Sequence, residues 1–177
     1  MLVKVTVSDN YTKLYNKVYA LLRNTTPLTA DCGILCERRC CKGTENKGML
    51  LFPGENTDLE VKETGEKRLA VCEGNCSRGS RPLSCMIFPF FPVIDEQGII
   101  SVDFDYRGVS VCPLITNGDV VSFNKKFFRN LLKAGKLLAK NDKFRKFMED
   151  VTEEINEAKE LYQRISKQNR PETKNRS

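Results

Sequence analysis

The spacing of the cysteines constrains this chain more than any other feature of its sequence. Four cysteines lie within ten residues, in the pattern C-x3-C-x3-C-C, at Cys32, Cys36, Cys40 and Cys41. Four more follow at Cys72, Cys76, Cys85 and Cys112. Closely spaced thiolates can converge on one metal, and distant cysteines can close the same site from another part of the fold. All eight cysteines are therefore candidate metal ligands.

The available ligand types narrow the choice of metal. Soft sulfur ligands favour zinc or iron–sulfur clusters over magnesium or calcium. The chain has no histidine, which excludes zinc sites that mix cysteine and histidine ligands. All-cysteine Zn2+ and an iron–sulfur cluster remain. A 4Fe–4S cluster is the preferred interpretation, because four early cysteines, distant ones and the Cys112-Pro113 pair suit such a cluster.

The adjacent pair Cys40-Cys41 adds a geometric argument. Neighbouring side chains point to opposite faces of a strand and diverge by about 100° in a helix. We therefore expect the two sulfurs to serve different sites, or one of them to bind while the other does not. Eight thiols can fill two four-cysteine sites, or one cluster with thiols to spare.

Two interpretations without a metal stay open. The cysteines are even in number and so could pair as disulfides. Residues 1–10 lack a secretory signal pattern, which counts against that arrangement and favours a cytoplasmic protein with reduced thiols. One or two cysteines could simply be small buried residues. Burial alone is a poor explanation of four cysteines within ten residues.

Composition excludes some partners. An apolar share of 40% is enough for one compact core. No run approaches the ~20 apolar residues of a membrane helix, so we expect no membrane partner. The net charge of +6 is concentrated in a basic stretch at residues 125–146, followed by an acidic one at 149–160. A solvated helix face explains this pattern better than nucleic-acid binding, which we do not expect.

Periodicity predicts an α+β fold. Short strands are expected at residues 2–8, 49–52 and 68–72, and a hairpin at 86–94 and 99–104. Apolar residues at helical spacing predict a helix at residues 11–22 and two more beyond residue 124. Residues 56–67 give no clear element, and residues 72–85 are expected to be irregular.

These elements predict three parts of the chain. Residues 1–120 form a small, irregular cysteine-cluster domain with short strands and an N-terminal helix. A C-terminal helical hairpin at residues 121–166 packs on that domain. Residues 167–177 are polar and are expected to be a disordered tail.

Several motifs occur in a recognisable order. They are Cys32, Cys36, Cys40-Cys41, Cys76, Arg81-Pro82-Leu83-Ser84-Cys85, Phe88-Pro89-Phe90 and Cys112. Residues 30–115 thereby resemble the CxxxCxxCC family of zinc- or iron-chelating domains (YkgJ-like cysteine cluster proteins). They are also similar to a module of flagellin lysine N-methylases. The chain has three residues between Cys36 and Cys40, where the family name implies two.

The resemblance implies a metal-binding cysteine cluster protein that holds an iron–sulfur cluster or zinc through its thiolates. Alternatives are a structural zinc-binding interaction module or, by resemblance alone, part of a protein-modifying enzyme such as a lysine N-methylase. Whether the chain is an enzyme, and which protein it partners or modifies, stay open. Without histidine, Ser–His–Asp and Cys–His catalytic arrangements are excluded.

Two further motifs flank the later cysteines. Arg81 is expected to offset thiolate charge at the cofactor, and Pro82 to stiffen the loop before Cys85. An ordinary exposed turn is an equally good interpretation of this pair. The segment Phe88–Pro92 is expected to form a core strand, with a hydrophobic lid over the metal as the alternative.

Overall fold

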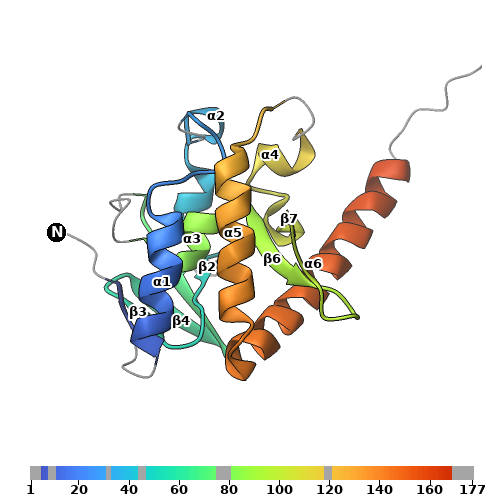
Figure 1. Ribbon diagram of the computed structural model, residues 1–177. Coiled ribbons are helices and arrows are strands. Elements are labelled where there is room, and N and C mark those ends of the chain that lie inside the picture. Colours follow the sequence, from blue (N-terminus) through green and yellow to red (C-terminus); the bar gives the residue numbers. More distant parts are fainter. Residues whose placement is uncertain are drawn as a thin grey trace, which may run out of the picture.

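The protein has an α+β fold, as predicted, with helices and three small antiparallel sheets (Figure 1). A computed structural model describes residues 5–7, 11–30, 33–43, 47–74, 81–117 and 121–168, with the backbone alone at 5–7, 34 and 35. The tail predicted at residues 167–177 begins too early, because residues 167 and 168 are helical. The rest of that tail and the ligand candidates Cys32 and Cys76 lie outside the described residues.

The described residues form seven short strands. They are β1 Val5–Val7, β2 Met49–Leu50, β3 Glu55–Thr57, β4 Glu60–Thr64, β5 Lys67–Val71, β6 Phe90–Ile94 and β7 Ile100–Phe104. The sheets have the strand orders β1-β3, β2-β5-β4 and β6-β7, and every pairing is antiparallel. The strands pair with near neighbours in sequence, except that β1 pairs with the distant β3. Strand β4 lies where no clear element was expected, because Val61 is its single apolar residue and it lacks an apolar alternation. Strand β5 confirms the strand predicted at residues 68–72, shifted by one residue.

Six helices and two 3-10 turns complete the described fold. The helices are α1 Thr12–Leu22, α2 Gly33–Cys36, α3 Leu83–Ile87, α4 Pro113–Thr116, α5 Lys125–Leu138 and α6 Asp142–Gln168. The 3-10 turns are η2 Arg39–Cys41 and η4 Tyr106–Gly108. No helix in the described ranges combines the length and the apolar character needed to cross a lipid bilayer.

The β6–β7 hairpin lies at the centre of the fold. Its register pairs Phe90 with Phe104 and Ile94 with Ile100, which confirms the predicted hairpin over this range. The Asp95 carboxylate accepts hydrogen bonds from the backbone N–H groups of Gln97 and Ile99 and so shapes the turn. The prediction was wrong before Phe90, because Met86 and Ile87 belong to helix α3 and not to the strand.

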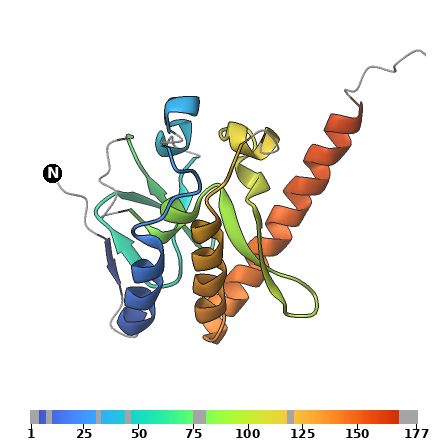
Figure 2. The same ribbon diagram turned by 45° about the horizontal axis from the view of Figure 1, so that its top comes forward.

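Both faces of β6 are covered. Phe90 packs on Phe127 and Phe128 of α5, whereas Phe91 stacks on Phe52. Helix α5 packs on α1 and on the hairpin, and α6 packs on β6 and η4. The two C-terminal helices follow one another as predicted and then diverge, so that the β6–β7 hairpin lies between them (Figures 1 and 2).

The segments that carry cysteines gather at one end of this frame. Both views show α2 and α4 at the same end of the molecule (Figure 2). A small cluster of buried side chains at α4 includes Leu28, Cys112 and Leu114. The larger core, built mainly on α1, α5, α6 and β6, also includes Leu83 and Ile87 of α3, the helix that carries Cys85, and in this way supports the cysteine-bearing end.

Candidate metal centre

Six cysteines line a single cavity of about 90 Å3. They come from the end of α2, from η2, from the residue after β5, from α3 and from the N-cap of α4: Cys36, Cys40, Cys41, Cys72, Cys85 and Cys112. Chain segments up to 76 residues apart in sequence thus contribute thiols to one space. Each of the predicted cysteine ligands that the structure describes lies at this cavity.

The first cysteine motif reverses direction within a few residues. Helix α2 ends in a turn closed by the bond from the Arg38 N–H to the Gly33 carbonyl (3.0 Å). Glu37 and Arg38 have φ values of 51° and 57°, the left-handed region that non-glycine residues seldom adopt. The chain then enters η2. The direction of the backbone changes within the three residues that separate Cys36 from Cys40, and both cysteines line the same cavity.

The adjacent sulfurs lie close together. The Sγ atoms of Cys40 and Cys41 are 3.9 Å apart, and both side chains line the cavity. Two thiolates on one tetrahedral zinc, with Zn–S bonds of ~2.3 Å, lie ~3.8 Å apart. The two sulfurs do not diverge, because the 3-10 geometry of η2 brings them together instead of placing them on opposite faces. The expectation that they serve different sites, or that one of them does not bind, stays a prediction.

The first motif docks directly on the segment that carries Cys72. The Gly43 N–H donates to the Cys72 carbonyl at 2.7 Å, and Lys42 forms an isolated bridge with Glu73. Beyond Cys72 the chain turns back, and the Gly74 N–H donates to the Cys72 sulfur at 3.4 Å. A backbone donor of this kind stabilises negative charge on sulfur, as in the hydrogen-bonded ligands of metal sites.

Helix α3 presents Cys85 and is anchored on two sides. The Leu83 N–H donates to the buried carboxylate of Glu55 at 2.8 Å. The Ser84 hydroxyl, one residue before the cysteine, donates to the Leu50 carbonyl of β2. Pro82 is buried at the N-cap of α3, so its role is to begin the helix, and it is not among the described residues that line the cavity.

Glu55 is the one buried carboxylate in this part of the fold that the sequence did not single out. Its side chain accepts hydrogen bonds from the Tyr19 hydroxyl (2.5 Å), the Phe52 N–H (3.0 Å) and the Leu83 N–H. Burial raises the pKa of Glu55, although these donors and nearby Arg68 oppose the shift. In the sequence, Glu55 follows Pro53-Gly54 with no pattern that marks it as buried.

Cys112 enters the cavity from a turn that follows η4. Its N–H donates to the Gly108 carbonyl at 3.0 Å, and Pro113 begins helix α4 directly after it. The ring of Phe88 packs close to Gly108, where a Cβ would lie 2.5 Å from the ring. Phe88 and Pro89 line the cavity while Phe90 begins the buried strand β6, so the segment serves as both wall and core.

The donor set suits a soft metal. Besides the six thiols, Met49 and Met86 line the cavity, and its charged lining residues are Arg38 and Arg81. Cations near sulfur favour the thiolate form that binds metal. No two of the six described cysteines form a disulfide. Within the described ranges, however, no three cysteine, aspartate or glutamate side chains are close enough together to hold a metal ion.

Comparison with known proteins finds no matching family model, curated protein or solved structure. The resemblance to cysteine cluster proteins therefore depends on the order of the motifs alone.

Proposed function

We propose that the cavity binds a metal centre through cysteine thiolates, with an iron–sulfur cluster as the first choice. The observation that carries the proposal is the convergence of six cysteines from five stretches of chain on one cavity. Six thiols are more than the four that either one zinc ion or one 4Fe–4S cluster takes, so the cavity offers enough ligands for either. By their place in the sequence, Cys32 and Cys76 belong to the same two motifs, and we include them in the proposed ligand set.

A bound centre would supply redox chemistry if it is a cluster, and fold stabilisation in either case. Arg38 and Arg81 would offset the negative charge of the thiolates. Because no three described donors stand within reach of one ion, we expect binding to draw the sulfurs closer together. Reduced thiols require a reducing compartment, so a cytoplasmic location is part of this proposal.

Structural zinc is the second candidate. It is favoured by the 3.9 Å separation of the Cys40 and Cys41 sulfurs, which matches two ligands of one tetrahedral ion. In that case the protein would act as an interaction module with a redox-silent metal. An enzyme such as a lysine N-methylase remains an alternative by resemblance alone.

Metal analysis separates these candidates. The protein is purified without oxygen, and iron, acid-labile sulfide and zinc are measured together with the visible spectrum. We expect iron and sulfide in similar amounts, with an absorbance that dithionite bleaches reversibly. A colourless protein with zinc and no sulfide selects the second candidate. A folded protein with neither metal rejects both.

Substitution of single ligands locates the centre. Cys36→Ser and Cys85→Ser remove thiols that α2 and α3 contribute to the cavity, and each should lower the metal content and the unfolding temperature. Leu114→Ile changes a cavity-lining side chain that carries no donor atom and serves as the control. Unchanged stoichiometry in a serine variant would remove that cysteine from the proposed ligand set.

A further inference from the structure

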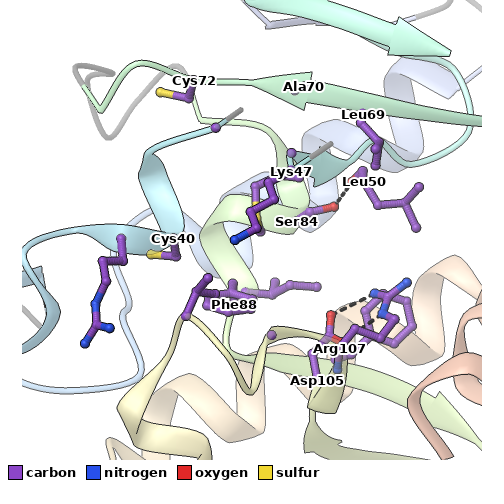
Figure 3. Close-up of a pocket in the computed structure, with 18 of the residues that line it drawn as sticks. Cys40, Lys47, Leu50, Leu69, Ala70, Cys72, Ser84, Phe88, Asp105 and Arg107 are labelled. Atoms are coloured by element: carbon purple, nitrogen blue, oxygen red, sulfur yellow. Dashed lines mark hydrogen bonds and ion pairs between the residues drawn. The ribbon is translucent and has the colours of Figure 1, made fainter. Parts of the chain in front are cut away.

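A second, larger cavity adjoins the cysteine cavity. It has a volume of about 360 Å3, within the range of small-molecule sites. Four residues line both cavities and form the boundary between them: Cys40, Met49, Cys72 and Phe88. Figure 3 shows Cys40 and Phe88 on the side of this larger pocket that faces the cysteine motifs. A molecule bound in the pocket would therefore lie directly beside the thiols.

The interior of the pocket is apolar. Strands β2 and β5, helix α3 and strand β6 supply its hydrophobic lining, which comprises Leu50, Leu69, Ala70, Ile87, Phe88, Phe90 and Phe91. These side chains belong to fixed elements, and the Ser84–Leu50 hydrogen bond ties α3 to β2 across the pocket wall (Figure 3). A ligand that fills this space must present an apolar body.

On one wall of the pocket, the positive and negative side chains pair with each other and their charges cancel. The guanidinium of Arg107 donates to both carboxylate oxygens of Asp105, at 2.8 and 2.7 Å, and to Glu154 at 3.0 Å. Lys67 also forms an ion pair with Glu154. Asp105 and Glu154 are the acidic residues among the described lining of the pocket. Both are ion-paired with Arg107 or Lys67 of the same wall.

The opposite wall carries excess positive charge. Arg39, Lys42 and Lys47 line the pocket on the side of the first cysteine motif. Within the part of the chain that the structure describes, neither Lys42 nor Lys47 forms an ion pair. In Figure 3 the Lys47 ammonium points into the space between Cys40 and Phe88. Cations above an apolar pocket attract an anionic group.

We propose that this pocket binds a small carboxylate with an apolar body. Lys42 and Lys47 would hold the carboxylate, and the apolar lining would hold the aliphatic or aromatic remainder. Binding itself needs no metal, whereas the position of the ligand next to a reactive centre rests on the proposed function. The site thus predicts an acidic small molecule as the substrate or effector of the cysteine centre.

A pair of matched probes tests the proposal. Binding of 2-naphthoate and of uncharged 2-naphthamide is measured by calorimetry on the purified holoprotein. We expect the carboxylate to bind more tightly by up to about tenfold, because ion pairs with exposed lysines are weak but favourable. The double variant Lys42→Gln/Lys47→Gln should abolish that preference and leave naphthamide binding unchanged. Contacts from the naphthyl ring to Phe88 and Leu69 in nuclear Overhauser spectra should locate the probe.

The control carries the same charge change elsewhere. Lys133→Gln/Lys136→Gln alters two exposed lysines of α5 that do not line the pocket, and it should keep the full preference for naphthoate. Equal affinity for the two probes, or equal loss in both double variants, would overturn the proposal. Metal content is measured on the same samples. Intact metal without naphthoate binding rejects the pocket alone, and naphthoate binding without metal rejects the metal centre alone.

Discussion

Glu55 shows how a single residue outside the cysteine motifs can determine the geometry of the centre. Its carboxylate joins α1, the loop before β3 and the first turn of α3 through three hydrogen bonds. Removing such a buried acceptor leaves donors unsatisfied, at ~1–3 kcal/mol each. Cys85 lies two residues beyond the anchored Leu83 N–H, so this buried acid holds one side of the proposed ligand set in place.

The raised pKa of Glu55 gives a pH dependence with a defined sign. Between the ordinary value of 4.5 and the raised pKa, the folded protein keeps a proton that the unfolded chain has released. The favourable contribution of this group is therefore complete below pH 4.5 and is lost as pH rises through the raised pKa. Urea unfolding of reduced, metal-free wild type and Glu55→Gln should show the wild-type free energy falling relative to the variant over this window. A difference that does not vary with pH would contradict the assignment.

Gly43 makes a second prediction at the residue scale. A Cβ there would lie 2.6 Å from Val71 Cγ1 and 3.0 Å from both the Cys72 nitrogen and the Lys47 carbonyl. Gly43→Ala should push the first motif away from β5, lower the free energy of unfolding by about 1–3 kcal/mol, and reduce the metal content. Gly65→Ala is the control. Its φ of 60° makes an alanine strained there, but an added Cβ would have no atom within 4 Å, so no contact between segments is disturbed. Equal metal content in both variants would remove this contact from the site.

The contact of α5 with β6 gives a prediction in which packing opposes helix propensity. Alanine normally stabilises a helix interior by ~1 kcal/mol relative to glycine. At Gly135, however, a Cβ would lie 2.6 Å from the Cβ of Pro92. We expect Gly135→Ala to lower the free energy of unfolding by about 1–3 kcal/mol, measured in urea. The exposed neighbour Lys136→Ala should have little effect, and a stabilised Gly135→Ala variant would show that α5 can shift freely.

Sequence patterns predicted the helices and strands whose apolar residues repeat at a regular spacing. Helices α5 and α6 were found because their apolar faces repeat at helical spacing, and the β6–β7 hairpin because a four-residue turn separates two apolar runs. Helix α3 was missed because its start depends on distant Glu55, which replaces a local cap. The members of the proposed site could be named from their residue type. Their convergence depends on long-range bonds such as that from Gly43 to Cys72, which spacing does not encode.

At the scale of the whole molecule, the cysteine-bearing end and the main core are separate clusters. Aromatic and aliphatic residues of α1, α5, α6 and β6 form a core that includes none of the six described cysteines. A zinc-finger peptide unfolds without metal because it has no such core. Metal removal should therefore loosen one end of this protein and leave the remainder folded.

Hydrogen exchange after treatment with a chelator tests this expectation. Amides at residues 33–43 and 109–116 should lose protection, whereas those of residues 127–155 should keep it. Far-ultraviolet circular dichroism should change little. Protein that has been oxidised by diamide serves as the control for thiol damage. Loss of amide protection throughout the described residues on metal removal would mean that the main core does not stay folded without the metal.

Phe88 separates the two cavities, and Gly108 lets its ring pack against the backbone. Occupancy of either cavity acts on the same ring and on the same Cys40 and Cys72 side chains. By thermodynamic linkage, a carboxylate that altered the affinity for the metal tenfold would have its own affinity altered tenfold by the metal. Because the two cavities share this wall, the two binding events would be coupled in both directions. The affinity for the small molecule would then depend on whether the metal is bound, and the affinity for the metal on whether the small molecule is bound.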